Sequence, residues 1–304
     1  MHRYEDFLAQ GITPAEVRRR VSAGELIRLR RGAFADPGSL ATPEDKHVEL
    51  IAATVPAISS DSVLSHTSAA VLHGLPVPAS ALARVHITRP GKGHGGRVGR
   101  HTHRHTTRLS ADARAELRGW PVTTYARTVV DCARSLPYAD AVAVVDAALR
   151  QGLDRAALFE ELDRARRQPG NVAARQAVTF GDGRAESPGE SRSRVVIAQL
   201  GLPTPDLQRE FFNDRGQVDA RVDFDWPDFG VCGEFDGETK YGRLRPAGLS
   251  LEQVMIFEKQ REERLREHGR WTVRWVSATV NQPEALRRVI ENGFRHGPRN
   301  GQWR

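Results

Sequence analysis

The sequence predicts a multidomain protein of mixed α+β and α/β class, and three observations support that fold class. The chain has 304 residues, enough for two or three domains that each bury their own core. Residues 1–40 carry, in order, the signals of a helix, a turn, a second helix and a hairpin. Residues 183–296 carry the signals of the order α-β-β-β-α-β. Residues 41–170, between these two segments, predict a small α/β domain.

The charge of the chain suggests a polyanionic partner. The net charge at pH 7 is +7 and the pI is about 10.0, a balance that bears on partners rather than on fold. Residues 84–108 hold seven Lys or Arg and no Asp or Glu, and the remaining residues hold 38 basic and 38 acidic side chains. One segment therefore accounts for the whole excess.

Cysteine usage and hydropathy favour a cytoplasmic protein without a membrane span. Only Cys132 and Cys232 are present, in no C-x-x-C pattern and within hydrophobic runs. This favours core thiols in a reducing compartment and argues against a zinc ribbon or a disulfide scaffold. Residues 1–10 are too polar for a signal peptide, and no apolar run reaches the roughly 18 residues of a membrane helix.

The first 40 residues predict a winged helix-turn-helix. Residues 4–9 form a short helix, and a second helix follows from a capping box in which Thr13 caps and Glu16 reaches back. Residues 26–29 and 32–35 are expected as two short strands. A basic helix of this kind suits the major groove of DNA and a basic hairpin suits its phosphates.

Six arginines of this segment are the expected DNA contacts. The alternative for those on the helix is an ordinary solvated face. The helix carries Arg18, Arg19 and Arg20, and the hairpin carries Arg28, Arg30 and Arg31.

The middle of the chain alternates helical and strand signals. Helices are expected at residues 42–56, 65–72, 139–149 and 155–165, and a strand at 83–88. Arg127 and Asp131 stand four residues apart on a further helix, as a surface ion pair. Gln168-Pro169-Gly170 starts a looser stretch, and Gly181–Arg184 marks a domain boundary.

Residues 89–100 (RPGKGHGGRVGR) are expected as a mobile basic loop that matches no phosphate-binding motif. The next residues place His101, His103 and His105 on one strand face, where a zinc site is geometrically possible. The favoured interpretation is a polar strand edge that meets phosphates or solvent. The nucleic-acid contacts expected here are Lys92, Arg97, Arg100 and Arg104.

Residues up to about 158 resemble the AbiEi-type antitoxin family of transcriptional regulators. The resemblance lies in the phrases GELIRLRRGAFADP, LSHTSAAVLHGLP, VHITRP and GWPVTTYARTVVDCAR, which come in family order. It implies a winged helix followed by a small α/β domain. It also implies DNA binding and, in some members, a role as antitoxin and autorepressor with a cognate toxin as partner.

The last third of the chain is organised around a hairpin with acidic residues. A capping box at residues 187–190 opens a helix to residue 200, and strands follow at 207–212, 221–226 and 231–236. A charged helix spans 249–268, a strand 271–276 and a final helix 283–292.

If residues 227–230 form a four-residue loop, Trp226 faces Val231 and Asp223 faces Glu234, with Cβ atoms about 5 Å apart. Alternation places Asp225 on the face of Asp223, and Asp236 on that of Glu234. Two carboxylates so close repel each other unless a cation or a proton lies between them.

This order and these acids resemble the PD-(D/E)XK nucleases, most closely the branch related to very-short-patch repair endonucleases. The matching phrases are VDFDWP, GEFDG, EKQREERLREHG and WTVRW, within residues 186–280. The resemblance implies Mg²⁺ or Mn²⁺ held by Asp223 and Glu234, with Asp236 as a further ligand and Glu190 acting through water.

The chain departs from that pattern at one position. Asp236 stands where the family has its lysine, and Lys240 is the nearest replacement. Arg261 on the following helix is expected to reach the carboxylate site or the phosphate backbone, with an ordinary surface ion pair as the alternative. Two hypotheses remain open: a metal-dependent DNA endonuclease, or a non-catalytic antitoxin-like regulator that keeps a nuclease fold. The sequence gives no oligomeric state and no cofactor loop of a metabolic enzyme.

Overall fold

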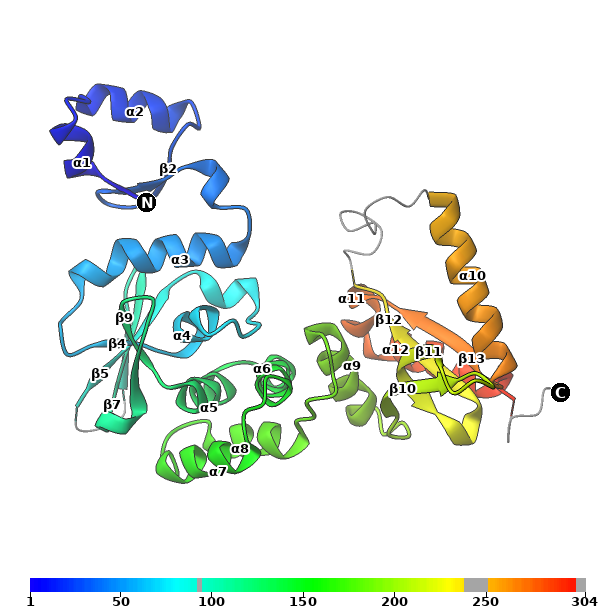
Figure 1. Ribbon diagram of the computed structural model, residues 1–304. Helices are drawn as coiled ribbons and strands as arrows, with labels where there is room; N and C mark the ends of the chain where they lie inside the picture. Colours follow the sequence, from blue (N-terminus) through cyan, green and yellow to red (C-terminus); the bar gives the residue numbers. More distant parts are fainter. Residues whose placement is uncertain (92–94, 238–250, 299–304) are drawn as a thin grey trace. The chain divides into compact units, whose positions relative to one another are not determined.

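The computed structural model describes residues 1–91, 95–237 and 251–298 (Figure 1). Two compact units divide the chain. The first holds Met1–Ala148 with Gly152–Phe180, and the second holds Leu149–Gln151 with Gly181–Arg304. Residues 1–40 and 41–170 thus lie within one unit apart from 149–151, and their division into two domains stays a prediction. No helix among the described residues is long and apolar enough to cross a membrane.

The amino-terminal segment folds as two short helices on a three-stranded sheet. Phe7, Val17, Leu26 and Phe34 form its core. The helix, turn, helix and hairpin order is the predicted one, while strand β1, which pairs with β3, was not predicted. The elements are β1 (His2–Arg3), α1 (Tyr4–Ala9), α2 (Pro14–Ser22), β2 (Ile27–Arg30) and β3 (Ala33–Ala35).

Only half of the predicted capping box of α2 forms. The Thr13 hydroxyl accepts a hydrogen bond from the backbone N–H of Glu16 at 3.2 Å. The Glu16 carboxylate does not return the bond, because it is held by the guanidinium groups of Arg19 and Arg20.

A six-stranded sheet forms the centre of the first unit. Its strand order is β6-β7-β5-β4-β9-β8. Two expectations were wrong here. The segment 89–100 contains strand β6 rather than being all loop, and β7 lies inside the sheet rather than at an edge. The strands are β4 (Val63–Leu64), β5 (Val85–Pro90), β6 (Gly95–Val98), β7 (Thr102–Thr107), β8 (Arg114–Leu117) and β9 (Trp120–Thr123).

Helices surround this sheet, and α3 lies between it and the amino-terminal segment (Figure 1). The stretch after residue 170 forms α8, and so is not loose. Arg127 and Asp131 are buried on α5 rather than exposed, because α7 and α8 pack over that helix. The helices are α3 (Pro43–Thr54), α4 (His66–Leu72), α5 (Tyr125–Ser135), α6 (Tyr138–Arg150), α7 (Arg155–Arg164) and α8 (Asn171–Phe180). Short 3-10 turns lie at Pro37–Ser39, Val55–Ala57, Ala79–Leu82 and Ala111–Ala113.

The second unit forms in the predicted element order around a four-stranded sheet, β10-β11-β12-β13. The first two pairs are antiparallel and β12 pairs with β13 in parallel. The elements are α9 (Pro188–Gln199), β10 (Asp206–Phe212), β11 (Val218–Trp226), β12 (Val231–Phe235), α10 (Leu251–Glu267), β13 (Trp271–Trp275), α11 (Ser277–Val280) and α12 (Pro283–His296), with a 3-10 turn at Pro227–Phe229.

Two apolar cores cover this sheet. Phe224 packs in the core that includes α9 and α12, whereas Val222 packs with Cys232 against Leu265 of α10. Residues two apart on one strand should share a face, so the strict alternation predicted for residues 221–226 is wrong. The adjacent strand shows the same disturbance, because Gln208, opposite Asp223 in the register, has a positive φ of 53°. Asp223 therefore lies where the β10–β11 ribbon changes face.

Candidate nucleic-acid interface, histidine cluster and carboxylate site

The amino-terminal arginines divide into two groups. Arg18, Arg28 and Arg31 are exposed and line one pocket of about 520 Å³ beside α2. Arg18 comes from α2 and Arg28 from β2, while Arg31 lies in the tight turn before β3. Within the described part of the chain none of these three has an acidic partner. We call this set the α2 arginine group.

The other helix arginines are already paired. Arg19 contacts Glu16 at 2.8 Å and Glu25 at 3.0 Å, and Arg20 contacts Glu16 at 3.0 Å. Hydrogen bonds from Arg19 and then Arg20 lower the pKa of Glu16 to about 2. These contacts hold both guanidinium groups against carboxylates, whereas Arg18 has no acidic partner among the described residues.

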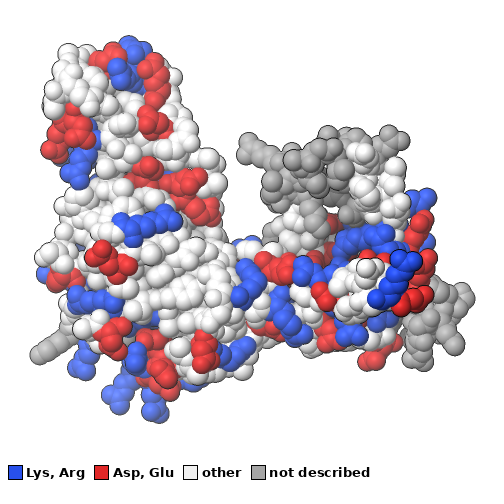
Figure 2. Space-filling view, in the orientation of Figure 1, with Lys and Arg blue, Asp and Glu red and all other residues white. Residues whose placement is uncertain are grey.

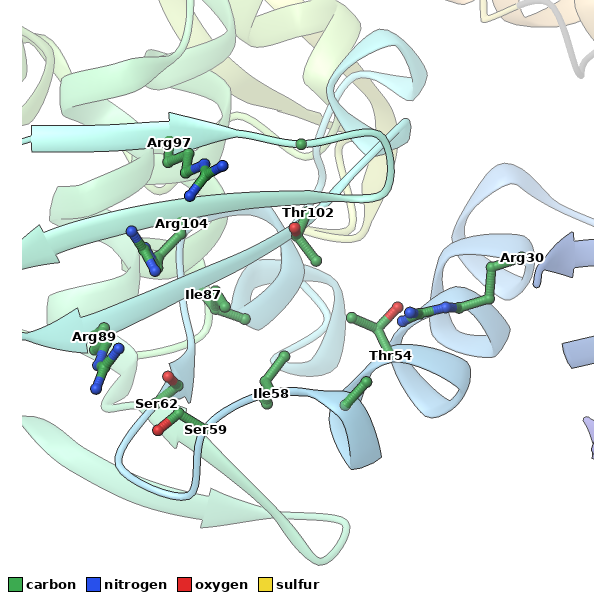
Figure 3. A pocket seen from close by; sticks show the side chains of 12 residues that line it. Arg30, Thr54, Ile58, Ser59, Ser62, Ile87, Arg89, Arg97, Thr102 and Arg104 are labelled. Atoms are coloured by element: carbon green, nitrogen blue, oxygen red, sulfur yellow. The ribbon is translucent and has the colours of Figure 1, made fainter. Parts of the chain in front are cut away.

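A second basic pocket, of about 310 Å³, brings together three predicted contacts that are distant in sequence (Figure 3). Arg97 and Arg104 are register partners on β6 and β7, and Arg30 lies across the pocket from them. Arg89 on β5, which the sequence did not single out, completes the lining and contacts Asp61 at 3.2 Å. The buried Nε of Arg104 has no hydrogen-bond partner among the described residues.

Of the other predicted nucleic-acid contacts, Arg100 is exposed beside β7 and lines neither pocket, and Lys92 lies outside the described residues. Arg261 belongs to the second unit, where it contacts Glu234. On the visible face of the first unit, Lys and Arg gather mainly along the lower edge (Figure 2). The described part of that face shows no continuous basic band, so its basic side chains lie in local groups.

The opposite face of β7 carries a histidine cluster that the sequence predicted only in part. His66, His86 and His105 each place a ring nitrogen within 4.8 Å of the others, the one such group of possible metal ligands found among the described residues. His86 Nδ1 lies 3.1 Å from His105 Nε2, and the rings of His66 and His105 stack at 3.7 Å. His103 stacks on His105 at 4.1 Å, whereas His101 lies outside the cluster.

The imidazoles of the cluster favour the neutral form. Burial lowers the pKa of His86 to about 3 and that of His105 to about 2, and the neighbouring histidines add to both effects. Burial also places the pKa of His66 well below its ordinary value. The sequence could not identify His66 and His86 as members, because the parallel pairing of β5 with β7 brings together strands separated by a crossover.

In the second unit the structure brings Glu190 and Asp223 together. The Gln208 side-chain amide lies 3.0 Å from Glu190 Oε2 and 3.3 Å from Asp223 Oδ1. Glu190 is buried, and its pKa is raised by that burial and by the charge of Asp223. Glu190 also accepts a hydrogen bond from the backbone N–H of Glu186 at 2.8 Å, so it both stabilises the start of α9 and faces Asp223. Sequence reasoning missed Gln208, whose type gave no signal.

Glu234 has a different environment. The hairpin register pairs Trp226 with Val231, as predicted, and extends to Phe224 with Gly233. Beyond it the Asp223 carboxylate accepts a hydrogen bond from the backbone N–H of Phe235 at 2.9 Å, and the facing of Asp223 and Glu234 stays a prediction. Glu234 is buried and lies 2.5 Å from Arg261 and 3.2 Å from Arg274. Two guanidinium groups therefore offset its charge, and Arg274 was not predicted.

The two remaining acids of the hairpin, Asp225 and Asp236, also have partners of their own. Asp236 is buried directly after β12, and its backbone N–H donates to the carbonyl of Trp275. Lys240, its expected replacement as the lysine of the motif, lies outside the described residues. Asp225 pairs with Arg270 at 2.6 Å, so Asp223 and Asp225 have separate partners.

Comparisons with known proteins agree with part of this picture. The chain is 29% identical over 256 residues to uncharacterized proteins of Mycobacterium tuberculosis strains CDC 1551 and H37Rv, which covers 80% of this chain and 90% of each relative. A family model described as a transcriptional regulator, AbiEi antitoxin, matches residues 3–35. This match covers α1, α2 and the β2–β3 hairpin, so the segment that holds the α2 arginine group is an AbiEi-type regulator motif.

Proposed function

We propose that this protein is a DNA-binding transcriptional regulator of the AbiEi antitoxin kind. The observation that carries the proposal is the α2 arginine group: three exposed arginines, gathered on a helix and a hairpin, that have no acidic partner in the part of the chain that the structure describes. In winged helix-turn-helix proteins the second helix enters the major groove, and neighbouring basic side chains contact phosphates. The match of residues 3–35 to AbiEi-type regulators supports the same assignment.

The second basic pocket extends the proposed interface within the first unit. Arg97 and Arg104 project from neighbouring strands, and the side chains of Ser62 and Thr102 supply hydroxyl groups to the same pocket. Arginine forks and hydroxyls are the groups that commonly bind phosphate oxygens. We therefore assign Arg97 and Arg104 to backbone contacts rather than to base recognition.

The proposal is tested by measuring affinity for DNA from upstream of the protein's own gene across a range of salt concentrations. Each phosphate contact contributes about 0.9 to the slope of log K against log salt. Arg18→Ala, Arg28→Ala and Arg31→Ala are each expected to reduce the slope by about 1. Arg184→Ala is the matched control, because it removes the same charge from an exposed arginine paired with Asp182 in the second unit. Equal slopes in all four variants would contradict the assignment.

An AbiEi-type antitoxin implies a cognate toxin protein as a partner. The corresponding experiment is coexpression with the products of adjacent genes, followed by pull-down on the tagged full chain. Loss of DNA binding in Arg18→Ala with pull-down retained would show that the two activities use different surfaces.

A second candidate function is metal-dependent cleavage of DNA in the second unit. The observation that favours it is the approach of Glu190 and Asp223 around Gln208, because two carboxylates that share one amide donor provide a place for a cation. These two residues fit Mg²⁺ or Mn²⁺ as oxygen ligands. Glu234 fits less well, since Arg261 and Arg274 already offset its charge. When bound, the ion would activate water and stabilise phosphate charge.

The cleavage proposal is tested with plasmid and linear DNA in Mg²⁺ or Mn²⁺. Asp223→Asn and Glu190→Gln keep the size of each side chain and remove its charge, and both are expected to abolish cleavage. Glu186→Gln is the control, because Glu186 is half-exposed and pairs with Arg221 on the surface. Equal nicking by wild type and the Asp223 variant would indicate a contaminant and refute this candidate.

A further inference from the structure

We propose that His66, His86 and His105 bind a divalent transition-metal ion of the zinc class in the first unit. The proposal is independent of the DNA-binding function and of the carboxylate site. The residues come from three elements: His66 from α4, His86 from β5 and His105 from β7. Three imidazoles with a fourth position left for another ligand are a common pattern for zinc.

The spacing of the nitrogens fits one ion. Zinc–nitrogen bonds of about 2.0–2.1 Å in a tetrahedral site place ligand atoms roughly 3.3 Å apart. The nitrogens of His86 and His105 are already 3.1 Å apart, and a nitrogen of each residue lies within 4.8 Å of those of the other two. Binding requires the hydrogen bond between His86 and His105 to open and the stacked rings of His66 and His105 to turn until their nitrogens point at one ion.

The backbone and its hydrogen bonds hold His66 in place. Its φ is 51°, in the left-handed region that a residue with a side chain rarely occupies, and such strained residues cluster at functional sites. The Ser65 hydroxyl contacts His66 Nδ1 at 3.0 Å, and Thr88 donates to the same hydroxyl at 2.8 Å. Metal-bound histidines commonly have a partner of this kind on the ring nitrogen that does not bind the ion.

The fourth position faces a pocket suited to an anion. His66 and His105 line a cavity of about 320 Å³ together with Arg127, Asp131 and Arg134. Asp131 contacts both guanidinium groups, at 2.9 and 3.0 Å. Nη2 of Arg127 is buried and has no hydrogen-bond partner among the described residues. A small anion on the metal could accept a bond from this group.

The test is titration of the chelator-treated full chain with Zn²⁺ by calorimetry and with Co²⁺ by visible absorption. We expect one equivalent of metal at the site and an intense four-coordinate cobalt spectrum. His86→Ala and His105→Ala should weaken binding by at least about 100-fold, and Ser65→Ala by about 10-fold. His101→Ala is the matched control from the same strand region, and Asp223→Asn excludes the carboxylate site.

Several results would overturn the proposal. The first is the absence of micromolar metal binding by wild type. The second is a weak six-coordinate cobalt spectrum. This spectrum is recorded on the wild-type chain, so it remains decisive if a histidine variant fails to fold. The third is an equal loss of binding in His101→Ala and His105→Ala, which would place the metal elsewhere on the chain.

Discussion

Replacing Glu190 by glutamine is expected to stabilise the second unit at neutral pH. The pKa of Glu190 is raised in the folded state, first by burial and then by Asp223. The folded chain therefore holds the Glu190 proton to a higher pH than the unfolded chain does. Above its unfolded pKa, ionisation of Glu190 lowers the free energy of unfolding as the pH rises. Glutamine removes this cost and keeps an oxygen for the Glu186 N–H and for the Gln208 amide.

The gain equals about 1.4 kcal/mol for each tenfold difference between the acid dissociation constants of the folded and unfolded chain. For a unit of this size each ~1 kcal/mol of gain raises Tm by roughly 3 °C. The difference between Glu190→Gln and wild type should grow from pH 4 to pH 7 and vanish in acid. A cation at the site would reverse the order, because Mg²⁺ would stabilise wild type and not the variant.

The assay is calorimetric unfolding of the full chain at several pH values, with and without Mg²⁺. Glu186→Gln is the control and should change stability by less than about 0.5 kcal/mol, as expected for an exposed ion pair. A Glu190→Gln variant that is less stable than wild type at pH 7 would refute the electrostatic account. It would show that Glu190 acts mainly as the helix-start acceptor.

Three further predictions concern buried contacts inside the individual units. Asp225→Ala should cost about 3–5 kcal/mol in denaturant unfolding, because it leaves Arg270 partly buried without its carboxylate; a loss below 1 kcal/mol would show that water replaces the pair. Gly189→Ala should lower Tm and perturb tryptophan fluorescence, because a Cβ would lie 2.0 Å from the Phe235 ring; an unchanged Tm would mean that the ring moves freely. His47 is buried with a lowered pKa, so its contribution to stability is present above about pH 6.5 and is lost as the pH falls; a His47→Gln variant should show a shallower acid decline in urea unfolding.

Local sequence signals predicted the helices whose first residues are a capping side chain followed by a proline. Thr13 with Pro14 begins α2, and Ser187 with Pro188 begins α9, each with the side-chain cap that the sequence indicates. The signals failed where pairing is non-local. Strand β1 has two residues and exists because it pairs with β3, and β6 is glycine-rich and exists because it pairs with β7. Neither has a hydrophobic pattern of its own.

In the candidate sites, too, local features could be predicted from the sequence and non-local contacts could not. The four-residue loop sets the register of β11 with β12, so the pairing of Trp226 with Val231 could be predicted from the loop length alone. The Glu190–Gln208–Asp223 contact could not, because it depends on the change of face at Gln208. Likewise, a zinc site on His101, His103 and His105 was only the less favoured interpretation of the sequence, and the histidine cluster takes only His105 from them.

The charges around the hairpin limit what a nuclease site would require. Glu234 faces Arg261 and Arg274, so this carboxylate has cationic partners before any metal binds. Glu190 and Asp223 accept from neutral donors: they share the Gln208 amide, Glu190 also accepts from the Glu186 N–H, and Asp223 from the Phe235 N–H. The pKa of Glu190 is raised by burial and by the charge of Asp223. A bound cation would therefore offset the most negative charge at Glu190 and Asp223. A regulator that keeps the fold without catalysis needs the arginine pairs of Glu234 but not the acidity of Glu190. The response of Glu190→Gln to Mg²⁺ therefore separates the two functions without relying on a cleavage assay.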